Sequence, residues 1–336
     1  MGKTNLLDAI HYLGLCKSHF SIPDAQLVKK EEDFFRLEAH LKRNSGRHKL
    51  VAKVQPSKKK KSFEKDGKTY DRLSDYIGQL PLIMIAPDDT IIGTGGSEER
   101  RKVIDETLCQ TNREYLTHLI AYNKLLKQRN AALKQMAKQR SWDHSLLDIY
   151  DAQMIPLAQF IFSTRKNWLE PMYSSFAKYY ERISQGAELP EIKYKSQLHD
   201  EDLAELFKLH RDKDVLLQRT TMGIHKDDLV FFLKDMPLKR FGSQGQLKSF
   251  IMALKLAQYS WLHKGVEEKP LLLLDDIFDK LDHYRVGDLL QLLAGEEFGQ
   301  VFISDTDIDR LPNILEKENL SAIHFVVEEG TVAPKS

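Results

Sequence analysis

Apolar residues at helical spacing predict several helices along the chain. Residues 5–15 place Leu6, Ile10 and Leu13 on one face, which predicts a helix close to the first residue. Residues 98–138 carry apolar positions at steps of three, four or seven and predict one long helix. Shorter helices are predicted over residues 200–212, 242–263 and 285–293.

A second long helix is predicted over residues 145–183. Pro156 and Pro171 lie inside it, and because proline removes a backbone donor we expect a kink or a break. The short connection at residues 139–144 predicts an antiparallel pairing of the two long helices. We interpret this hairpin as a packed helical subdomain.

Two kinds of strand pattern are present. Residues 34–80 alternate partially between apolar and polar positions, with turn signals at 44–46 and 66–67, and predict a small antiparallel sheet. Residues 271–274 and 301–304 are almost wholly apolar, which is typical of parallel strands buried on both faces. Further strands are predicted over residues 190–198 and 230–233.

Composition narrows the class of protein. The 336 residues suggest two domains, and 50 Lys+Arg against 49 Asp+Glu leave a net charge of +1. Any affinity for polyanions must therefore come from local clusters of charge. Two cysteines exclude a disulfide framework, disfavour a zinc site and fit a cytoplasmic location. No apolar run reaches the roughly 18 residues that a membrane helix needs, so we expect no membrane partner.

The first candidate motif is Gly2-Lys3-Thr4. It matches the end of the phosphate-loop pattern, in which a glycine lets backbone approach phosphate, a lysine neutralises it and a hydroxyl holds Mg²⁺. A following helix directs its N-terminus at the anion. Alone, this tripeptide is better explained as a chance match or a plain helix start.

The second candidate motif is an apolar strand that ends in two carboxylates, Asp275 and Asp276. This is the Walker B pattern, in which one carboxylate holds Mg²⁺ and the next polarises the attacking water. A buried strand with a solvated turn is the alternative.

The third is Ser243-Gln244-Gly245-Gln246, about 30 residues before Asp275 at the opening of a helix. It fits a capping box with Ser243 as N-cap and Gln246 three residues on.

These motifs, in this order, resemble the RecF family of bacterial recombination mediators, which is related to SMC-type ATPase heads. The matching stretches span almost the whole chain; they are GKTNLLDAIHYL at 2–13, LPLIMIAPDD at 80–89, EERRKVID at 98–105, GIHKDDLVFFL at 223–233, FGSQGQLKSFIMALKLAQ at 241–258 and LLLLDDIFDKLD at 271–282. The resemblance implies an α/β P-loop ABC-type ATPase head, with a mixed sheet, a small antiparallel sheet and an inserted α-helical subdomain. The expected division is 1–96, 97–212 and 213–336.

The resemblance also implies roles for particular residues. Asp275 and Asp276 would be the catalytic carboxylates, and Thr4 and Asp275 would hold Mg²⁺. Asp276 stands where related heads carry a glutamate and is shorter by one methylene, which implies slow hydrolysis. The residues expected to bind ATP in the same subunit or across a dimer are Gly2, Lys3, Thr4, Asn5, Ser243, Gly245, Gln246, Asp279 and Asp282.

Two further residues were considered at the site. Residues 304–307 stand where many ABC-type heads have a histidine switch, but no histidine is present, which leaves Thr306 as a candidate phosphate sensor. His225 is interpreted as structural.

RecF-like chains carry a strand and the first half of the phosphate loop before the position of Gly2. We therefore expect Met1 to be an internal methionine of that loop, with weakened folding and ATP binding as the consequence.

Clusters of positive charge are candidates for DNA contact. Residues 40–68 hold eleven Lys/Arg and two acids, and residues 115–142 hold six Lys/Arg and no acid. Such clusters neutralise phosphates without recognising sequence. Solvated surface is the alternative for each residue. The candidate contacts are Lys58, Lys59, Lys60, Lys61, Lys127 and Arg129.

The expected function is an ATP-gated homodimer in recombinational DNA repair and replication restart. It would bind DNA at single-strand gaps and assist RecA loading with RecO and RecR, with weak DNA-stimulated ATPase activity. The alternatives are a transporter-type ATPase subunit and a DNA-binding protein that does not use nucleotide.

Overall fold

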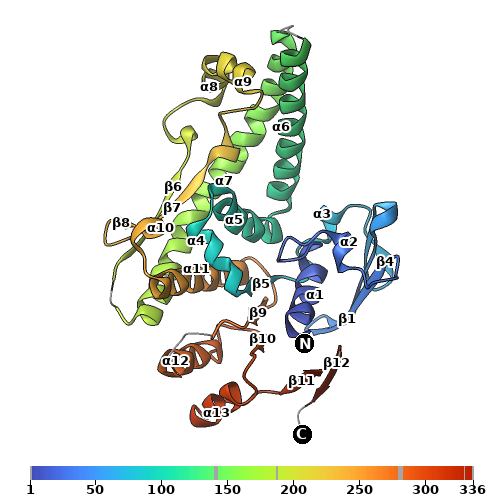
Figure 1. Cartoon of the computed structure of the whole chain (residues 1–336), viewed down its shortest axis with the longest axis vertical. Coiled ribbons are helices and arrows are strands. Elements are labelled where there is room, and N and C mark those ends of the chain that lie inside the picture. The colour runs from blue at the N-terminus through green and yellow to red at the C-terminus, as the bar shows by residue number, and fades with distance from the viewer. Residues whose placement is uncertain (1, 140–142, 187, 279–282, 329, 335–336) are drawn as a thin grey trace. The chain divides into compact units, whose positions relative to one another are not determined.

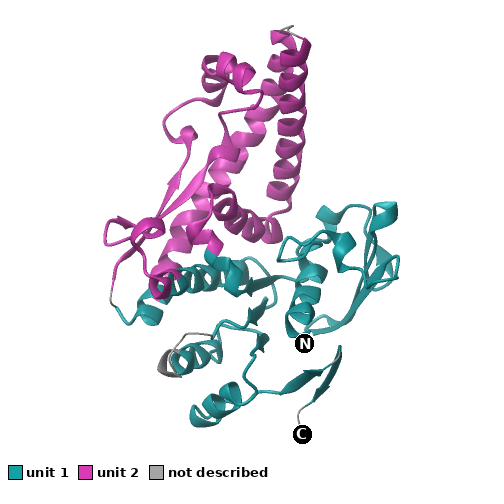
Figure 2. Ribbon diagram, in the orientation of Figure 1, with its two compact units in different colours: residues 1–90, 179–186, 248–336 teal, residues 91–178, 187–247 magenta. Residues whose placement is uncertain are grey.

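The computed structural model places most of the chain in two compact units, shown in different colours in Figure 2. The described residues are 2–139, 143–186, 188–278, 283–328 and 330–334. Unit 1 comprises Met1–Thr90, Tyr179–Gly186 and Lys248–Ser336, and unit 2 comprises Ile91–Lys178 and Ala187–Leu247. The division into domains at 1–96, 97–212 and 213–336 stays a prediction.

The centre of unit 1 is a parallel sheet of three described strands in the order β10-β9-β5. The strands are β5 (Leu82–Ile85), β9 (Leu271–Asp275) and β10 (Val301–Ser304). Leu272, Leu273 and Leu274 are fully buried, which confirms that this apolar run is an internal strand. Because all three strands are parallel, their carboxyl ends meet at one edge.

A four-stranded antiparallel sheet lies in the first part of unit 1, as its alternating pattern predicted. Two tight turns join its strands at the predicted positions, and Gly46, Asp66 and Gly67 adopt the left-handed backbone that such turns require. The strands are β1 (Phe35–Arg43), β2 (Gly46–Gln55), β3 (Lys60–Lys65) and β4 (Lys68–Thr69).

Helix α1 (Lys3–Leu15) packs between this sheet and the parallel strands. Leu13 of the predicted face is buried and Ile10 packs against the core, but Leu6 is 42% exposed, whereas Leu7 is 5% exposed. Leu7 and Tyr12 join a core cluster with side chains of β2 and β3. Two adjacent leucines satisfy the helical pattern equally well, so the neighbours of the helix decide which one is buried.

The rest of unit 1 consists of short elements. A two-stranded hairpin, β11–β12, lies close to the C-terminus. The elements are α2 (Asp24–Leu27), η1 (Pro56–Lys58), α3 (Leu73–Tyr76), η2 (Pro87–Thr90), α12 (His283–Leu293), α13 (Arg310–Lys317), β11 (Phe325–Glu328) and β12 (Thr331–Pro334).

Unit 2 is built on the predicted helical hairpin. Helices α6 (Arg113–Gln139) and α7 (His144–Ser184) lie side by side and share a small apolar cluster that includes Leu133 and Leu147 (Figure 1). Of the kink or break predicted in α7, the break is wrong, because one helix runs through Pro156 and Pro171, and the kink stays a prediction.

The prediction of one helix over residues 98–138 is also wrong. α5 (Ser97–Thr111) ends at Asn112, which has an extended backbone and whose side chain accepts a hydrogen bond from the Tyr115 amide at 2.8 Å. A side chain that caps the following helix explains the interruption.

Unit 2 also contains an antiparallel sheet in the order β6-β7-β8. The helix predicted over residues 200–212 is instead two short helices, the first capped by Asp202. The remaining elements are α4 (Ile91–Thr94), β6 (Pro190–Lys195), η3 (Gln197–His199), α8 (Leu203–Leu209), α9 (Arg211–Leu217), η4 (Ile224–Lys226), β7 (Asp228–Leu233), β8 (Met236–Pro237), α10 (Leu238–Phe241) and α11 (Gln244–Lys264), which continues into unit 1.

The observed face of α1 gives a direct test. Replacing Leu7 with alanine removes a buried side chain and leaves a cavity, so we expect a loss of about 2–5 kcal/mol in the free energy of unfolding. Leu6→Ala is the matched control and should change stability by no more than about 0.5 kcal/mol. Urea denaturation followed by circular dichroism measures both, and equal losses would contradict the assignment of the buried face.

Candidate functional site

The predicted phosphate-loop residues lie at the N-terminus of α1. Gly2 has φ 119°, in the left-handed region that favours glycine, and its carbonyl accepts a hydrogen bond from the Leu6 amide at 3.0 Å. Thr4 and Asn5 are exposed one turn into the helix, and Lys3 is half-buried. The free amides of this first turn form a region of positive potential.

Thr4 meets the predicted Walker B strand. Its hydroxyl donates to Asp275 Oδ1 at 3.1 Å, although the two residues are 271 positions apart in the chain. Asp275 is the last residue of β9 and is buried. Its Oδ1 also accepts from the hydroxyl of Ser304, the last residue of β10, at 2.6 Å. One carboxylate oxygen therefore joins α1, β9 and β10.

Asp276, the next residue in the chain, is less buried than Asp275. Its φ of 45° turns the chain out of the sheet, and its amide donates to Ser304 Oγ at 3.1 Å. The side chain is 33% exposed and accepts from the Thr306 hydroxyl at 3.4 Å. Asp275 is thus a fixed carboxylate, whereas Asp276 is open to solvent.

The amino group of Lys3 reaches the loop after β10. It donates to the backbone carbonyl of Asp305 at 2.6 Å. The carboxylate of Asp305 is held in turn by the Arg310 guanidinium, whose Nε lies 2.7 Å from Oδ2. Sequence analysis marked residues 304–307 as the place of a histidine switch but assigned a role only to Thr306, so it gave none to Ser304 and Asp305. It did not identify Arg310 at all.

These residues fit a Mg²⁺-bound phosphate group. A carboxylate oxygen and a hydroxyl oxygen in contact are donors that Mg²⁺ prefers, and a lysine with a helix N-terminus beside them suits the anion. Asn5 is exposed, and its predicted role in binding ATP stays a prediction. Among the described residues, no group of three or more His, Cys, Asp and Glu could hold a metal by itself.

The third motif lies in unit 2 and has the predicted capping geometry. The Ser243 amide donates to Gln246 Oε1 at 2.7 Å, and the Gln246 amide donates to Ser243 Oγ at 3.2 Å. Ser243 and Gly245 are exposed, and a Cβ on Gly245 would find its nearest neighbour 4.0 Å away. This helix start is therefore accessible to another molecule. Asp279 and Asp282 lie outside the described residues.

A buried ion pair lies at the edge of the parallel sheet where its strands end. Asp89, which follows β5, lies 3.2 Å from Lys255 of α11 and 3.5 Å from His19. It also accepts from the Ala86 amide at 2.9 Å. Burial raises the pKa of Asp89, but the attraction of Lys255 and His19 and the hydrogen bonds outweigh it and lower the pKa to about 2. Sequence analysis did not find this pair.

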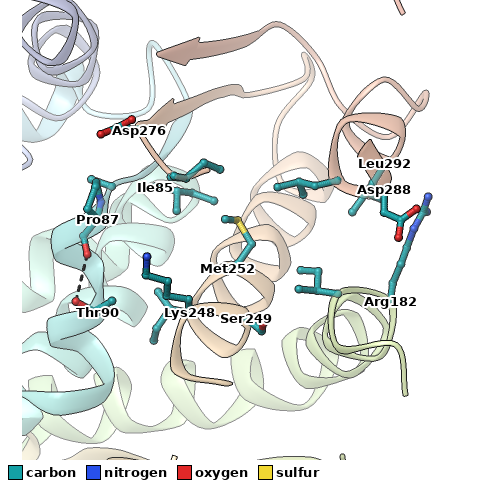
Figure 3. Close-up of a pocket in the computed structure, with 15 residues that line it drawn as sticks. Ile85, Pro87, Thr90, Arg182, Lys248, Ser249, Met252, Asp276, Asp288 and Leu292 are labelled. Atoms are coloured by element: carbon teal, nitrogen blue, oxygen red, sulfur yellow. Dashed lines mark hydrogen bonds between the residues drawn. The ribbon is translucent and has the colours of Figure 1, made fainter. Parts of the chain in front are cut away.

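A pocket in unit 1 opens beside Asp276 (Figure 3). Its walls are largely apolar, with Met252 of α11 and Leu292 of α12 among them. None of Gly2, Lys3, Thr4 or Asp275 lines it, so it is separate from the candidate phosphate residues.

The structure places the predicted basic residues in different environments. Lys58, Lys59 and Lys60 are exposed on η1 and the start of β3. Lys61 is half-buried, bonded to Asp24 at 2.8 Å and placed over the Tyr12 ring. On α6, the exposed lysines form a stripe along one face because they follow helical spacing. These are Lys124, Lys127, Lys134 and Lys138.

Arg129 corrects the sequence prediction. Its side chain is fully buried, with Nε 2.7 Å from Asp151 Oδ1 and a terminal nitrogen 2.6 Å from Asp214 Oδ2. A buried arginine held by two carboxylates cannot contact DNA at the surface, and its role is structural. His225 is structural as predicted, hydrogen-bonded to Tyr122 and to the Thr220 carbonyl.

Solved structures define the class of protein. The fold is that of the ABC-type ATPase heads. The chain superimposes on the head domain of an Smc protein from Pyrococcus furiosus with a TM-score of 0.52 at 16% identity, over all of this chain and 87% of that one. A RecF structure described with ATP matches with a TM-score of 0.88 at 25% identity, over all of this chain and 89% of that one.

Sequence relatives define the family. The chain is 41% identical to the DNA replication and repair protein RecF of Phocaeicola vulgatus, over all of this chain and 90% of that protein. It is 42% identical to the RecF protein of Flavobacterium johnsoniae, over 94% of this chain and 88% of that protein. The chain belongs to the RecF family of DNA replication and repair proteins. No model of a protein family matches the chain. Within the described residues, no helix is both long and apolar enough to cross a membrane.

The Asp89–Lys255 pair predicts an acid-dependent loss of stability. The pKa of Asp89 is lower in the folded protein than its ordinary 3.8, so its contribution of about 2 kcal/mol is complete above pH about 4 and disappears as the pH falls toward 2. Asp89→Asn should therefore be less stable than the wild type at neutral pH, and the difference should shrink below pH about 4.

Thermal unfolding measured across this pH range tests the prediction. Asp88→Asn is the matched control, because Asp88 is the exposed neighbour of the buried residue. A stability difference for Asp89→Asn that does not change with pH would contradict the ion pair.

Proposed function

We propose that this protein is an ATP-gated, DNA-binding homodimer that acts in recombinational DNA repair and replication restart. The observation that carries the proposal is the contact of Thr4 with Asp275, with Lys3 beside it, in a chain of the RecF family. Motifs at opposite ends of the sequence converge there on one phosphate-binding arrangement. A solved relative described as RecF with ATP in the RecFOR pathway supports ATP as the ligand.

In this proposal each residue has a distinct task. Gly2 lets the backbone approach the phosphates, Lys3 neutralises them, and Asn5 adds a contact from the first turn of α1. Thr4 and Asp275 hold Mg²⁺, which when bound screens phosphate charge and orients the terminal phosphate. Asp276 orients the attacking water and accepts its proton from an exposed position. Its short side chain makes hydrolysis slow, which suits a timer.

Nucleotide would act as the bridge between two copies. The start of α11 carries the proposed contacts Ser243, Gly245 and Gln246. The amides of Ser243 and Gln246 are held by the capping box, so the exposed Gly245 amide and the Ser243 hydroxyl are the groups proposed to meet a phosphate held by a second subunit. Asp279 and Asp282 are proposed to lie in the loop that crosses the interface. Association then depends on a triphosphate in each subunit.

The proposed biological setting follows the family. The dimer binds duplex DNA near single-strand gaps without recognising sequence, and with RecO and RecR it helps RecA replace single-strand-binding protein. The exposed lysines of η1, β3 and α6 supply the contacts to phosphates. The cytoplasm is the proposed location.

Association tests the central claim. With saturating ATP and Mg²⁺, sedimentation velocity should show the wild type shift from monomer to dimer. Ser243→Arg places a bulky side chain in front of the α11 amides, so it should stay monomeric while it still binds ATP. Asp275→Asn removes the metal carboxylate and should lose both binding and association.

A serine at another helix start is the matched control. Ser145 is exposed in the first turn of α7, and Ser145→Arg should dimerise as the wild type does. A wild type that stays monomeric with nucleotide, or a Ser243→Arg variant that dimerises normally, would refute the proposed bridge.

DNA affinity tests the basic surface. Replacing Lys58, Lys59 and Lys60 with glutamine should weaken duplex binding and reduce the slope of log K against log salt by up to about 3, because fewer counterions are released. Lys61 is left in place because it bonds Asp24 within the fold. Fluorescence anisotropy over a salt series measures both quantities.

The control changes the same number of exposed lysines elsewhere in unit 1, at Lys29, Lys30 and Lys264. Its salt dependence should match that of the wild type. If the two triple variants weaken binding equally, total charge rather than this surface determines affinity.

A further inference from the structure

The loop after β10 carries a second cation that the proposed function does not use. Arg310 opens α13, and its side chain is 19% exposed. Its guanidinium binds both carboxylate oxygens of Asp305, with Nε 2.7 Å from Oδ2 and a terminal nitrogen bonded to Oδ1. The same guanidinium lies 4.0 Å from Asp276 Oδ1. Arg310 is therefore placed between a buried carboxylate and the candidate catalytic one.

Asp305 connects this arginine to the phosphate-loop lysine. Its carboxylate holds Arg310, and its backbone carbonyl accepts from Lys3 Nζ at 2.6 Å. Both cations of the site are thus held by one residue. A ligand that draws Lys3 off the carbonyl acts on the residue that restrains Arg310, so the two cations are coupled.

The balance of charge favours an anionic ligand for these cations. The hydrogen bonds that Arg310 donates to the Asp305 carboxylate, followed by the attraction of neighbouring carboxylates, raise the pKa of Arg310, so its guanidinium stays charged at any physiological pH. A guanidinium presents a planar fork of donors that matches two oxygens of a carboxylate or of a phosphate equally well. The two carboxylate oxygens of Asp305 therefore take up the same donors of Arg310 that two oxygens of a terminal phosphate could accept from.

The geometry points to Arg310 as a specificity-determining residue that distinguishes a nucleoside triphosphate from a diphosphate. It exchanges Asp305 for the terminal phosphate, on the side of the site where Asp276 lies. This inference rests on the proposed binding of ATP at Lys3 and Thr4. It assigns the recognition of the terminal phosphate to Arg310, in place of Thr306, which donates only to Asp276.

Binding of two nucleotides measures the discrimination without any turnover. Isothermal titration calorimetry with Mg²⁺ compares the non-hydrolysable triphosphate AMP-PNP with ADP. Arg310→Ala should weaken AMP-PNP at least about tenfold, the effect of losing one charge-assisted hydrogen bond, and change ADP binding by less than about threefold. Arg310→Lys should fall between the wild type and the alanine variant, because it keeps the charge and loses the fork.

A second variant moves the result in the opposite direction. Asp305→Asn keeps the carbonyl that holds Lys3 but removes the carboxylate that competes for Arg310, so AMP-PNP should bind more tightly than to the wild type. A purely structural salt bridge predicts the contrary, because either change would loosen the loop and weaken binding. Arg36→Ala is the matched control, since it removes an exposed arginine–carboxylate pair with Glu38 elsewhere in unit 1.

The outcomes separate this inference from the proposed function. A wild type that binds neither nucleotide refutes ATP binding itself, and with it the role of Arg310. A wild type that prefers AMP-PNP, with an unchanged preference in Arg310→Ala, overturns the role of Arg310 alone. If thermal unfolding shows that the alanine variant does not fold, the ratio of AMP-PNP to ADP affinity in Arg310→Lys and Asp305→Asn tests the role of Arg310 instead.

Discussion

The hydrogen bond from Thr4 to Asp275 is the contact on which the site depends. It joins the first turn of a helix to the end of a buried strand, and the hydroxyl of Ser304 brings the neighbouring strand to the same carboxylate oxygen. A buried carboxylate is costly unless its oxygens are hydrogen-bonded. Hydrogen bonds from the hydroxyls of Thr4 and Ser304 offset that cost. The same contacts fix the positions of the groups that could hold a cation and a phosphate.

Around this contact, the parallel sheet brings polar side chains together at the edge where its strands end. Asp89 follows β5, Asp275 and Asp276 end or follow β9, and Ser304 ends β10, so four polar residues come from three strands with the same direction. They differ in environment: Asp89 and Asp275 are buried, and Asp276 is open. The edge of the sheet therefore combines buried, hydrogen-bonded carboxylates with one that solvent reaches.

Sequence alone predicted the elements that a strong local pattern or a motif specifies. The apolar run at 271–274 indicated an internal strand, and the phosphate-loop and Walker B patterns predicted one site for Thr4 and Asp275, which the structure brings into contact; their shared metal stays a prediction. Choices between equivalent local solutions failed: Leu6 against Leu7, and a solvated against a buried Arg129, are decided by partners far away in the chain. The Arg310–Asp305 pair has no periodicity and belongs to no motif, so only the folded loop reveals it.

The backbone at Asp276 has a consequence for substitutions at this position. A φ of 45° is a conformation that aspartate and asparagine adopt more readily than longer side chains, because their short polar groups can bond locally. The reach of the carboxylate and the bend of the chain are therefore linked. Lengthening the residue to glutamate would gain a methylene only with added conformational strain, so the main chain limits which acidic side chain this position accepts.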